Sequence, residues 1–205
     1  AAAAGQYTLL RLPPPPDTTP CDTPTRLLCL LRTDPHGSRP FPPPHPAADA
    51  RHRLHTHWNL DAASVLAAQC LDIQPGHAVL DMCAAPGGKS ITLAQRLWPA
   101  LYVDHPSGEQ QHRQRPSILH ANEVDVARHR RLHANLTSYL PPTLFEQGLV
   151  DVLRIDATSP RAVHLFPLGE EGYDRILIDA PCSSERHILH AFMRAQQSGS
   201  LAPET

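Results

Sequence analysis

Short apolar runs, each closed by an acidic residue, recur four times between residues 78 and 179. Continuous apolar runs of this length are typical of strands that are buried in a parallel sheet. Between the runs lie stretches with apolar residues at helical spacing, most clearly over residues 90–97 and 124–139. The pattern therefore predicts an α/β fold with four parallel strands, over residues 78–81, 117–123, 150–156 and 174–179.

The acidic residues that close the four runs are Asp81, Glu123, Asp156 and Asp179. Right-handed crossovers bring the carboxyl ends of parallel strands to one edge of the sheet. Open α/β sheets bind their ligands at that edge. We therefore expect the four carboxylates to lie close together and to mark a binding site.

The region before the first strand predicts one more helix. Residues 61–71 are rich in alanine with apolar residues at helical spacing, and Asp61 is suited to cap the first turn. Pro75 and Gly76 then indicate a turn into the first strand. Residues 98–116 are polar and rich in turn formers, so we expect an insertion between the second helix and the second strand.

The first 57 residues are rich in proline and histidine, and we expect them to be poorly ordered. The proline runs at residues 13–16 and 40–46 favour extended polyproline conformations and exclude helix. Residues 26–32 are apolar enough for one strand or a short helix. The predicted organisation is thus a Pro/His-rich region over residues 1–57, a folded domain over residues 58–190 and a tail over residues 191–205.

Composition narrows the range of partners. The formal net charge is −2, so the chain lacks the general positive field that drives non-specific binding to nucleic acid. Contact with RNA would need a local site, for example the helix that carries Arg128, Arg130 and Arg131, unless that basic face is merely solvated. No apolar run approaches the ~20 residues of a membrane-spanning helix, so no membrane partner is expected.

The five cysteines include no C-x-x-C pair, which favours a reducing, intracellular compartment over a disulfide framework. No metal is expected either. The histidine cluster His52, His55 and His57 has neither a cysteine nor a carboxylate to complete a site. His129 and His133 are four residues apart but lack the glutamate of a zincin motif.

The turn after the first strand carries the most specific pattern, Cys83 to Ser90. Pro86 presets a turn, and Gly87 and Gly88 allow backbone conformations and close approaches that a side chain would prevent. The end of this segment is similar to a phosphate-binding P-loop, but Cys83 stands where that motif needs glycine. An ordinary turn without a ligand is the other alternative.

The whole string from Asp81 to Lys89 resembles the cofactor loop of the Nop/Sun (RsmB/NOP-type) family of RNA cytosine-5 methyltransferases. The segment Asp61-Ala62-Ala63-Ser64 is similar to the family's sequence upstream of that loop. Asp179-Ala180-Pro181-Cys182 resembles its fourth motif, and residues 183–187 continue as in the mitochondrial-type members. The resemblance implies a Rossmann-like class I methyltransferase sheet, incomplete at its C-terminal side.

The resemblance also implies that the cofactor is S-adenosyl-L-methionine. The turn would hold its methionine end with Cys83, Ala84, Ala85, Pro86, Gly87, Gly88 and Lys89. A carboxylate after the second strand accepts both hydroxyls of a ribose in related sheets, which selects Glu123, with Asp125 as the alternative. Asp156 would accept from the adenine amino group, and Asp179 completes the expected cofactor set. The cofactor has no phosphates, which fits a single lysine.

The expected catalytic residues are Asp179 and Cys182. Cytosine C5 becomes nucleophilic only after a thiolate has added to C6, and Asp179 is placed to hydrogen-bond the ring at N3 or N4. In the family the attacking cysteine comes from a later Thr-Cys-Ser motif, and the Pro-Cys cysteine assists product release. Cys182 matches the second role, unless it is simply a buried structural cysteine. No cysteine follows it before Thr205.

We therefore expect an RNA cytosine-5 methyltransferase that acts on rRNA or tRNA, represented by a piece that lacks its nucleophile and turns over no substrate. The alternatives are a non-catalytic RNA- or cofactor-binding relative that works with a protein partner, and a P-loop nucleotide hydrolase. The resemblance favours a mitochondrial location, with nucleolar and cytoplasmic locations as the other options.

Overall fold

The computed structural model describes residues 7–11, 28–32, 54–101, 115–168, 171–181 and 192–195. The first two segments are described as strands without their side chains. Cys182, the motif continuation at residues 183–187, the proline runs and His52 lie outside the described residues.

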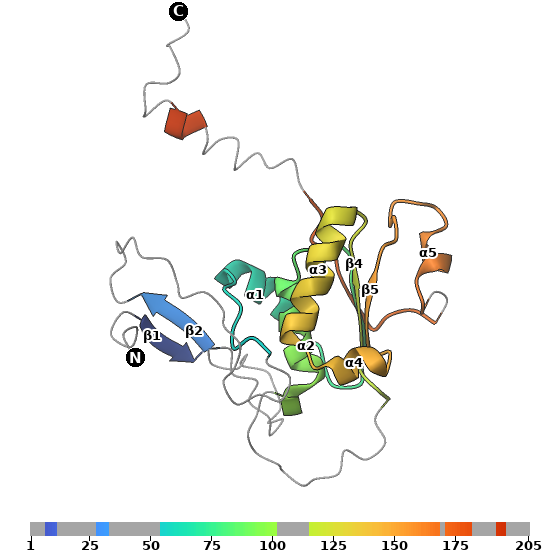
Figure 1. Cartoon of the computed structure of the whole chain (residues 1–205), viewed down its shortest axis with the longest axis horizontal. Coiled ribbons are helices and arrows are strands. Elements are labelled where there is room, and N and C mark those ends of the chain that lie inside the picture. The colour runs from blue at the N-terminus through green and yellow to red at the C-terminus, as the bar shows by residue number, and fades with distance from the viewer. Residues whose placement is uncertain are drawn as a thin grey trace, which may run out of the picture.

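The sheet of the domain consists of four parallel strands, as the sequence predicted. They are β3 (Ala78–Asp81), β4 (Ile118–Asn122), β5 (Val150–Leu153) and β6 (Arg175–Leu177), in the spatial order β5-β4-β3-β6 (Figure 1). The first of these strands thus lies between the second and the fourth. This is the order of a doubly wound sheet, whose ligand crevice opens where the strand order reverses, here between β3 and β6.

Three of the strands end earlier than predicted, β4 by one residue and the other two by more. β5 ends three residues before Asp156, and β6 ends two residues before Asp179. At β5 the reason is a side chain: the N–H of Ile155 donates to Asn122 Oδ1 and leaves the strand ladder. Asp81 is the last residue of β3, and Glu123 directly follows β4.

The helices cover the two faces of the sheet unequally. α1 (Ala62–Gln69), α2 (Gly88–Leu97), α3 (Val126–Tyr139) and the short α4 (Pro142–Glu146) belong to one side, whereas only α5 (Ala162–Leu165) lies on the other (Figure 1). A 3₁₀ turn, η1 (Pro99–Leu101), follows α2. Asp61 caps α1 as predicted, because its Oδ1 accepts the N–H of Ser64 at 2.9 Å. α3 begins two residues later than predicted, because Asp125 is its N-cap.

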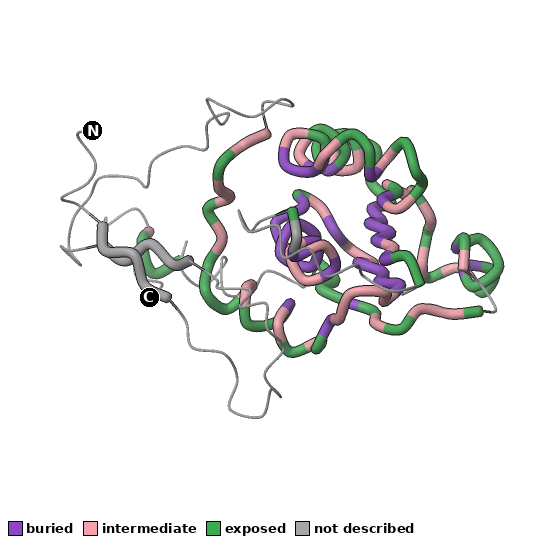
Figure 2. Tube along the Cα trace, turned by 90° about the horizontal axis from the view of Figure 1, so that it is seen from below, coloured by how far each residue is buried: buried purple, intermediate pink, exposed green. Residues whose placement is uncertain are grey.

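The larger core lies between the sheet and α2 and α3. Leu93 of α2 and Leu132 and Leu136 of α3 are fully buried there against Val79 and Leu119 of the sheet. Figure 2 shows this core as the buried stretches of the strands together with the inward sides of the helices. The other face holds a small cluster of Leu80, Ala162 and Phe166.

The N-terminal region contains a two-stranded antiparallel pair, β1 (Tyr7–Arg11) and β2 (Leu28–Arg32), with Leu9 opposite Leu30. Residues 28–32 of the apolar segment are therefore a strand, which was one of the two forms predicted for residues 26–32. β1 was not predicted. No helix among the described residues is long and apolar enough to cross a membrane.

Gly87 offers a direct test of this packing. Its φ of +112° is rarely adopted by residues with a side chain, and a Cβ there would lie 3.2 Å from Leu132 Cδ1. We expect Gly87→Ala to lower the free energy of unfolding by about 1–3 kcal/mol, measured by urea denaturation. Gly148→Ala is the control, because Gly148 also has positive φ but no atom within 4 Å of its added Cβ. Equal losses in the two variants would contradict a packing role for Gly87.

Candidate functional site

The turn between β3 and α2 is tied down by hydrogen bonds from its neighbours. The N–H of Ala84 donates to the carbonyl of Asn122 at 2.8 Å. From α3, Arg128 Nη2 donates to the Ala85 carbonyl at 3.1 Å, and Asn135 Nδ2 donates to the Pro86 carbonyl at 2.7 Å. The Ala85–Pro86 peptide bond is cis. The turn is therefore a fixed element rather than a free loop.

The start of α2 packs against a segment that sequence reasoning did not connect with the site. A Cβ on Gly88 would lie 2.7 Å from Trp58 Nε1 and 2.9 Å from Leu60 Cδ1. Glycine at this position therefore allows residues 58–60 to approach the helix terminus. Trp58 in turn packs edge-on against Tyr139 of α3, with 5.1 Å between the ring centroids.

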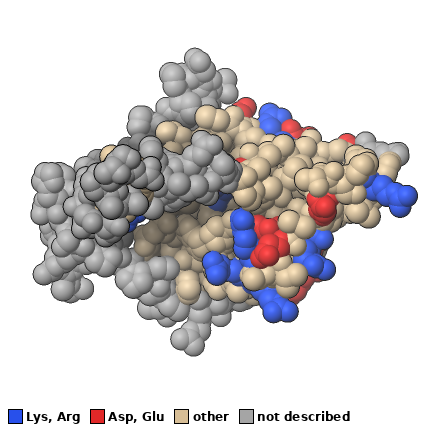
Figure 3. All heavy atoms as spheres, turned by 90° about the horizontal axis from the view of Figure 1, so that it is seen from above, with Lys and Arg blue, Asp and Glu red and all other residues tan. Residues whose placement is uncertain are grey.

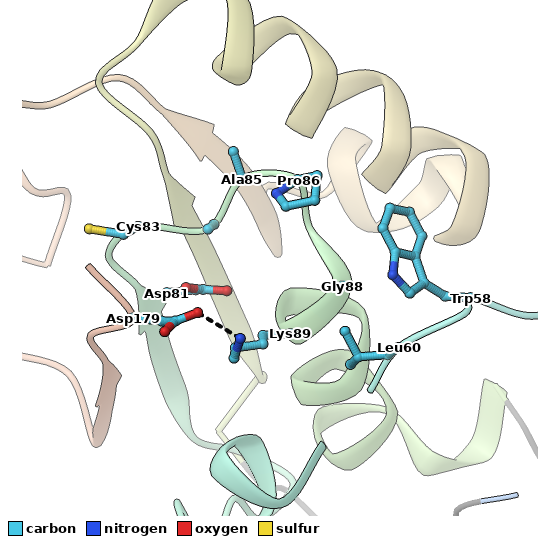
Figure 4. Close-up of a pocket in the computed structure, with 10 residues that line it drawn as sticks. Trp58, Leu60, Asp81, Cys83, Ala85, Pro86, Gly88, Lys89 and Asp179 are labelled. Carbon is cyan, nitrogen blue, oxygen red and sulfur yellow. Dashed lines mark ion pairs between the residues drawn. The ribbon is translucent and has the colours of Figure 1, made fainter. Parts of the chain in front are cut away.

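A pocket opens at this edge of the sheet, between the segment at residues 58–60 and the ends of β3 and β6 (Figure 4). It combines an apolar wall, the backbone of the turn, two carboxylates and one ammonium group. Its lining residues are Trp58, Leu60, Asp81, Cys83, Ala84, Ala85, Pro86, Gly88, Lys89 and Asp179. The predicted turn and Asp179 thus come together in one pocket, as expected from the strand order.

Lys89 connects α1 to the end of β6. Its Nζ lies 2.6 Å from Asp179 Oδ2 (Figure 4). The same Nζ donates a hydrogen bond of 3.0 Å to Ser64 Oγ. Ser64 Oγ donates in turn to Asp61 Oδ2 at 2.7 Å. The Asp61–Ser64 segment noted in the sequence is therefore joined to the pocket through the lysine. Asp179 itself is 56% exposed, so its carboxylate is accessible to a ligand.

Asp81 is the most deeply buried charged group of the pocket, with 1% exposure. Its Oδ2 accepts a hydrogen bond of 2.6 Å from Ser90 Oγ, whereas its Oδ1 has no hydrogen-bond partner among the described residues. Burial raises the pKa of Asp81 to about 6, although Ser90 and the Lys89 charge act in the opposite direction. A buried carboxylate oxygen that lacks a donor fits a ligand that carries an ammonium or N–H group.

Glu123 lies at the end of the neighbouring strand and is 5% exposed. Its Oε1 accepts the N–H of Asp125 at 3.0 Å. Its Oε2 lies 3.0 Å from Arg128 Nη2, an ion pair that lacks hydrogen-bond geometry. The same guanidinium holds the Ala85 carbonyl, so Arg128 joins Glu123 to the turn. The alternative ribose acceptor, Asp125, is already engaged as the cap of α3 through the N–H of Arg128.

Asp156 stands apart from the pocket, on the loop after β5. Its Oδ1 accepts both the N–H and the hydroxyl of Thr158, at 3.0 and 2.7 Å, and these two bonds hold its pKa below the usual value. Neither Asp156 nor Glu123 lines the pocket. The structure therefore gathers the turn, Lys89 and Asp179 in one pocket and leaves these two acids along the adjoining edge of the sheet.

The Cys83 thiol and the potential metal ligands add little to the chemistry of the site. Burial raises the pKa of the Cys83 thiol, with smaller contributions from Glu123 and Asp81, so this cysteine stays protonated at neutral pH. No group of three or more potential metal ligands occurs within the part of the chain that the structure describes.

Sequence reasoning missed Trp58 and Leu60 as parts of the pocket, and it did not single out Asn122. Asp81 was expected at the binding edge, as the residue that closes the first strand, but no ligand contact was assigned to it. The signal for Asp81 was present, because a carboxylate that closes a fully apolar strand is predicted to be buried. Nothing in the sequence pattern indicates a role in the site for Trp58, Leu60 or Asn122.

A family model described as 16S rRNA methyltransferase RsmB/F matches residues 68–192. The chain belongs to this family. The match includes the turn after β3, the acids Glu123 and Asp156 and the motif that begins at Asp179. It agrees with the resemblance drawn from the sequence. It favours the methyltransferase interpretation of the turn over a P-loop.

Individual relatives agree with the family assignment. A mitochondrial tRNA (cytosine(34)-C(5))-methyltransferase of Danio rerio is 37% identical over 137 residues, which are 67% of this chain and 31% of that protein. The 5-cytosine rRNA methyltransferase NSUN4 of Xenopus laevis is 37% identical over 133 residues, 65% of this chain and 27% of the relative. The chain thus spans about a third of the length of the curated relatives it matches.

Among solved structures, the crystal structure of PH0851 is 29% identical to this chain. It is matched over 64% of this chain and 24% of its own, with a TM-score of 0.45.

The raised pKa of Asp81 predicts how stability depends on pH. The pKa of its carboxyl is about 6 in the folded state and has the ordinary value of 3.8 in the unfolded state, so the folded state binds the proton more tightly. The stability of the wild type therefore falls as pH rises between these two values. Asp81→Asn removes this dependence. Relative to the wild type, the variant should gain up to about 3 kcal/mol between pH 4 and pH 7 in urea unfolding.

Asp151→Asn, an exposed change on β5, serves as the control and should show no such gain. Parallel pH profiles for the wild type and Asp81→Asn would contradict the burial of a charged Asp81.

Proposed function

We propose that this domain binds S-adenosyl-L-methionine at the carboxyl edge of its sheet, and that the protein methylates C5 of cytosine in RNA. Membership of the RsmB/F family and the activities for which the relatives are named support the reaction class. The structural observation that carries the proposal is the pocket between β3 and β6, where the glycine-containing turn meets Lys89 and Asp179.

The residues of the site fit this cofactor. Its methionine end carries an ammonium group, and Asp81 Oδ1 on the pocket wall is a buried acceptor that has no donor among the described residues. Its ribose carries two hydroxyl donors, and Glu123 Oε2 accepts no hydrogen bond from the part of the chain that the structure describes. Among the described residues that line the pocket, Lys89 is the one cationic side chain, as expected for a ligand without phosphates.

The proposed contacts are as follows. The turn from Cys83 to Lys89 holds the methionine end, with Asp81 as the acceptor for its ammonium group. Glu123 accepts the ribose hydroxyls. Asp156 accepts from the adenine amino group through Oδ2, because Thr158 already occupies Oδ1. These roles account for three of the four carboxylates that close the predicted strands.

When it is bound, S-adenosylmethionine supplies an electrophilic methyl group. The protein's own contribution is to hold the cytosine. Asp179 is oriented by Lys89 and is exposed, so its carboxylate can accept a hydrogen bond from the base amino group at N4. Cys182 follows three residues later, and we assign it the product-release role that its Pro-Cys context implies. The Cys83 thiol is not a candidate nucleophile, because burial raises its pKa.

The RNA and the compartment follow from the relatives. Their names include both tRNA and rRNA cytosine-5 enzymes, one of them mitochondrial, so we propose an rRNA or tRNA substrate and a mitochondrial location. On the face shown in Figure 3, basic and acidic side chains are interspersed rather than segregated. RNA recognition by this domain should therefore depend on the pocket and on specific contacts more than on a broad basic surface.

Calorimetry with S-adenosylhomocysteine, the product form of the cofactor, tests the binding site. We expect Glu123→Gln to weaken binding by about 10- to 100-fold, because hydrogen bonds to a charged acceptor contribute about 1.5–3 kcal/mol. Glu146→Gln makes the same chemical change at an exposed position of α4 and should leave the affinity unchanged. Equal affinities for the wild type and Glu123→Gln would contradict the ribose assignment.

Transfer of a labelled methyl group to RNA tests the reaction. Because no cysteine follows Cys182 in these 205 residues, we expect this chain alone to bind S-adenosylhomocysteine but to methylate no cytosine. Binding without turnover is also the behaviour of a non-catalytic relative. Turnover by this chain would instead make Cys182 the nucleophile, which its replacement by alanine would confirm.

A further inference from the structure

Asn122 holds together the two loops that flank it at the edge of the sheet. Its Nδ2 donates to the carbonyl of Met82 at 3.0 Å and to the carbonyl of Ile155 at 2.9 Å. Its Oδ1 accepts the N–H of Ile155 at 2.8 Å, and its own carbonyl accepts the N–H of Ala84 at 2.8 Å. One residue thus makes four hydrogen bonds to segments 33 to 40 residues away along the chain.

The orientation of the side chain is determined by its partners. Backbone carbonyls can only accept and a backbone N–H can only donate, so Nδ2 must face Met82 and Oδ1 must face the N–H of Ile155. Asn122 is 2% exposed, and water therefore cannot replace these bonds without a rearrangement. Asparagine is required here, because aspartate has no donor for the two carbonyls and glutamine is one methylene longer.

The segments joined by Asn122 are those that carry the proposed ligand contacts. Met82 and Ala84 flank Cys83 at the start of the turn, Glu123 is the next residue in the chain, and Ile155 precedes Asp156. Strand pairing does not join the two loops directly, because β4 lies between β3 and β5, which end at Asp81 and Leu153. Beyond the strand ends, the Asn122 side chain bridges them.

We propose that Asn122 is a positioning residue for the cofactor site. It fixes the spacing between the turn after β3 and the loop after β5, and therefore between the groups that hold the two ends of the ligand. The inference rests on the proposed function, because it assigns these loops to opposite ends of one molecule. A ligand that spans both loops loses affinity when their spacing is no longer fixed, since binding must then restore it.

Calorimetric titration of the 205-residue chain with S-adenosylhomocysteine tests the proposal through the variant Asn122→Asp. This change keeps the size of the side chain and removes both donated hydrogen bonds. The control is Leu144→Ala, a buried change in α4 next to the start of β5, at the opposite end of the strand. It lowers stability without touching either loop, and both variants are titrated at a temperature at which circular dichroism shows them folded.

We expect Asn122→Asp to raise the Kd at least about tenfold while Leu144→Ala stays within about twofold of the wild type. A wild-type Kd in Asn122→Asp, or an equal loss of affinity in Leu144→Ala, would overturn the positioning role. Absence of binding by the unaltered chain would refute the proposed cofactor site itself, and this inference with it.

If Asn122→Asp does not fold, amide hydrogen exchange of the unaltered chain decides the question. The N–H groups of Ala84 and Ile155 both donate to Asn122. Saturation with S-adenosylhomocysteine should therefore slow exchange at both amides by a similar factor. Protection of Ala84 without protection of Ile155 would show that the loops respond independently and would overturn the proposal.

Discussion

The site depends on how closely the turn after β3 approaches the helices around it. Gly87 adopts a φ that residues with a side chain disfavour, and it packs against Leu132 of α3. Because Gly88 has no side chain, Trp58 and Leu60 can pack directly against it. Since α2 begins at this point, the same packing sets the direction of the helix and the position of Lys89 on its first turn. The contact between Lys89 and Asp179, and the pocket wall opposite to them, both follow from it.

Around this turn the domain accepts an electrostatic cost. Two carboxylates, Asp81 and Glu123, are almost fully buried, and each keeps one oxygen without a hydrogen bond among the described residues. Burial of such groups is unfavourable unless a partner compensates it. Lys89 and Arg128 compensate part of the charge, and a ligand with ammonium and hydroxyl donors would supply the rest. The geometry is therefore better suited to a bound state than to an empty one.

Much of this arrangement could be predicted from the sequence. The four strands, the cap at Asp61 and the meeting of the turn with Asp179 follow from local patterns and from the rule that parallel strands share one carboxyl edge. The bridge through Asn122 and the wall formed by Trp58 could not be predicted, because both depend on contacts between segments far apart in the chain. The position of Asp156 beyond the end of β5 has the same origin, since the Asn122 side chain ends that strand's ladder.

The central claim is that a nucleoside-containing cofactor binds across the carboxyl edge of this sheet. A ¹H–¹⁵N correlation spectrum recorded during titration with S-adenosylhomocysteine tests it most directly. We expect shifts for the amides of Ala84, Gly88 and Glu123, at that edge, and none for Gly148, which precedes β5 at the opposite edge. An unchanged spectrum, or shifts produced equally by ATP with magnesium, would contradict it.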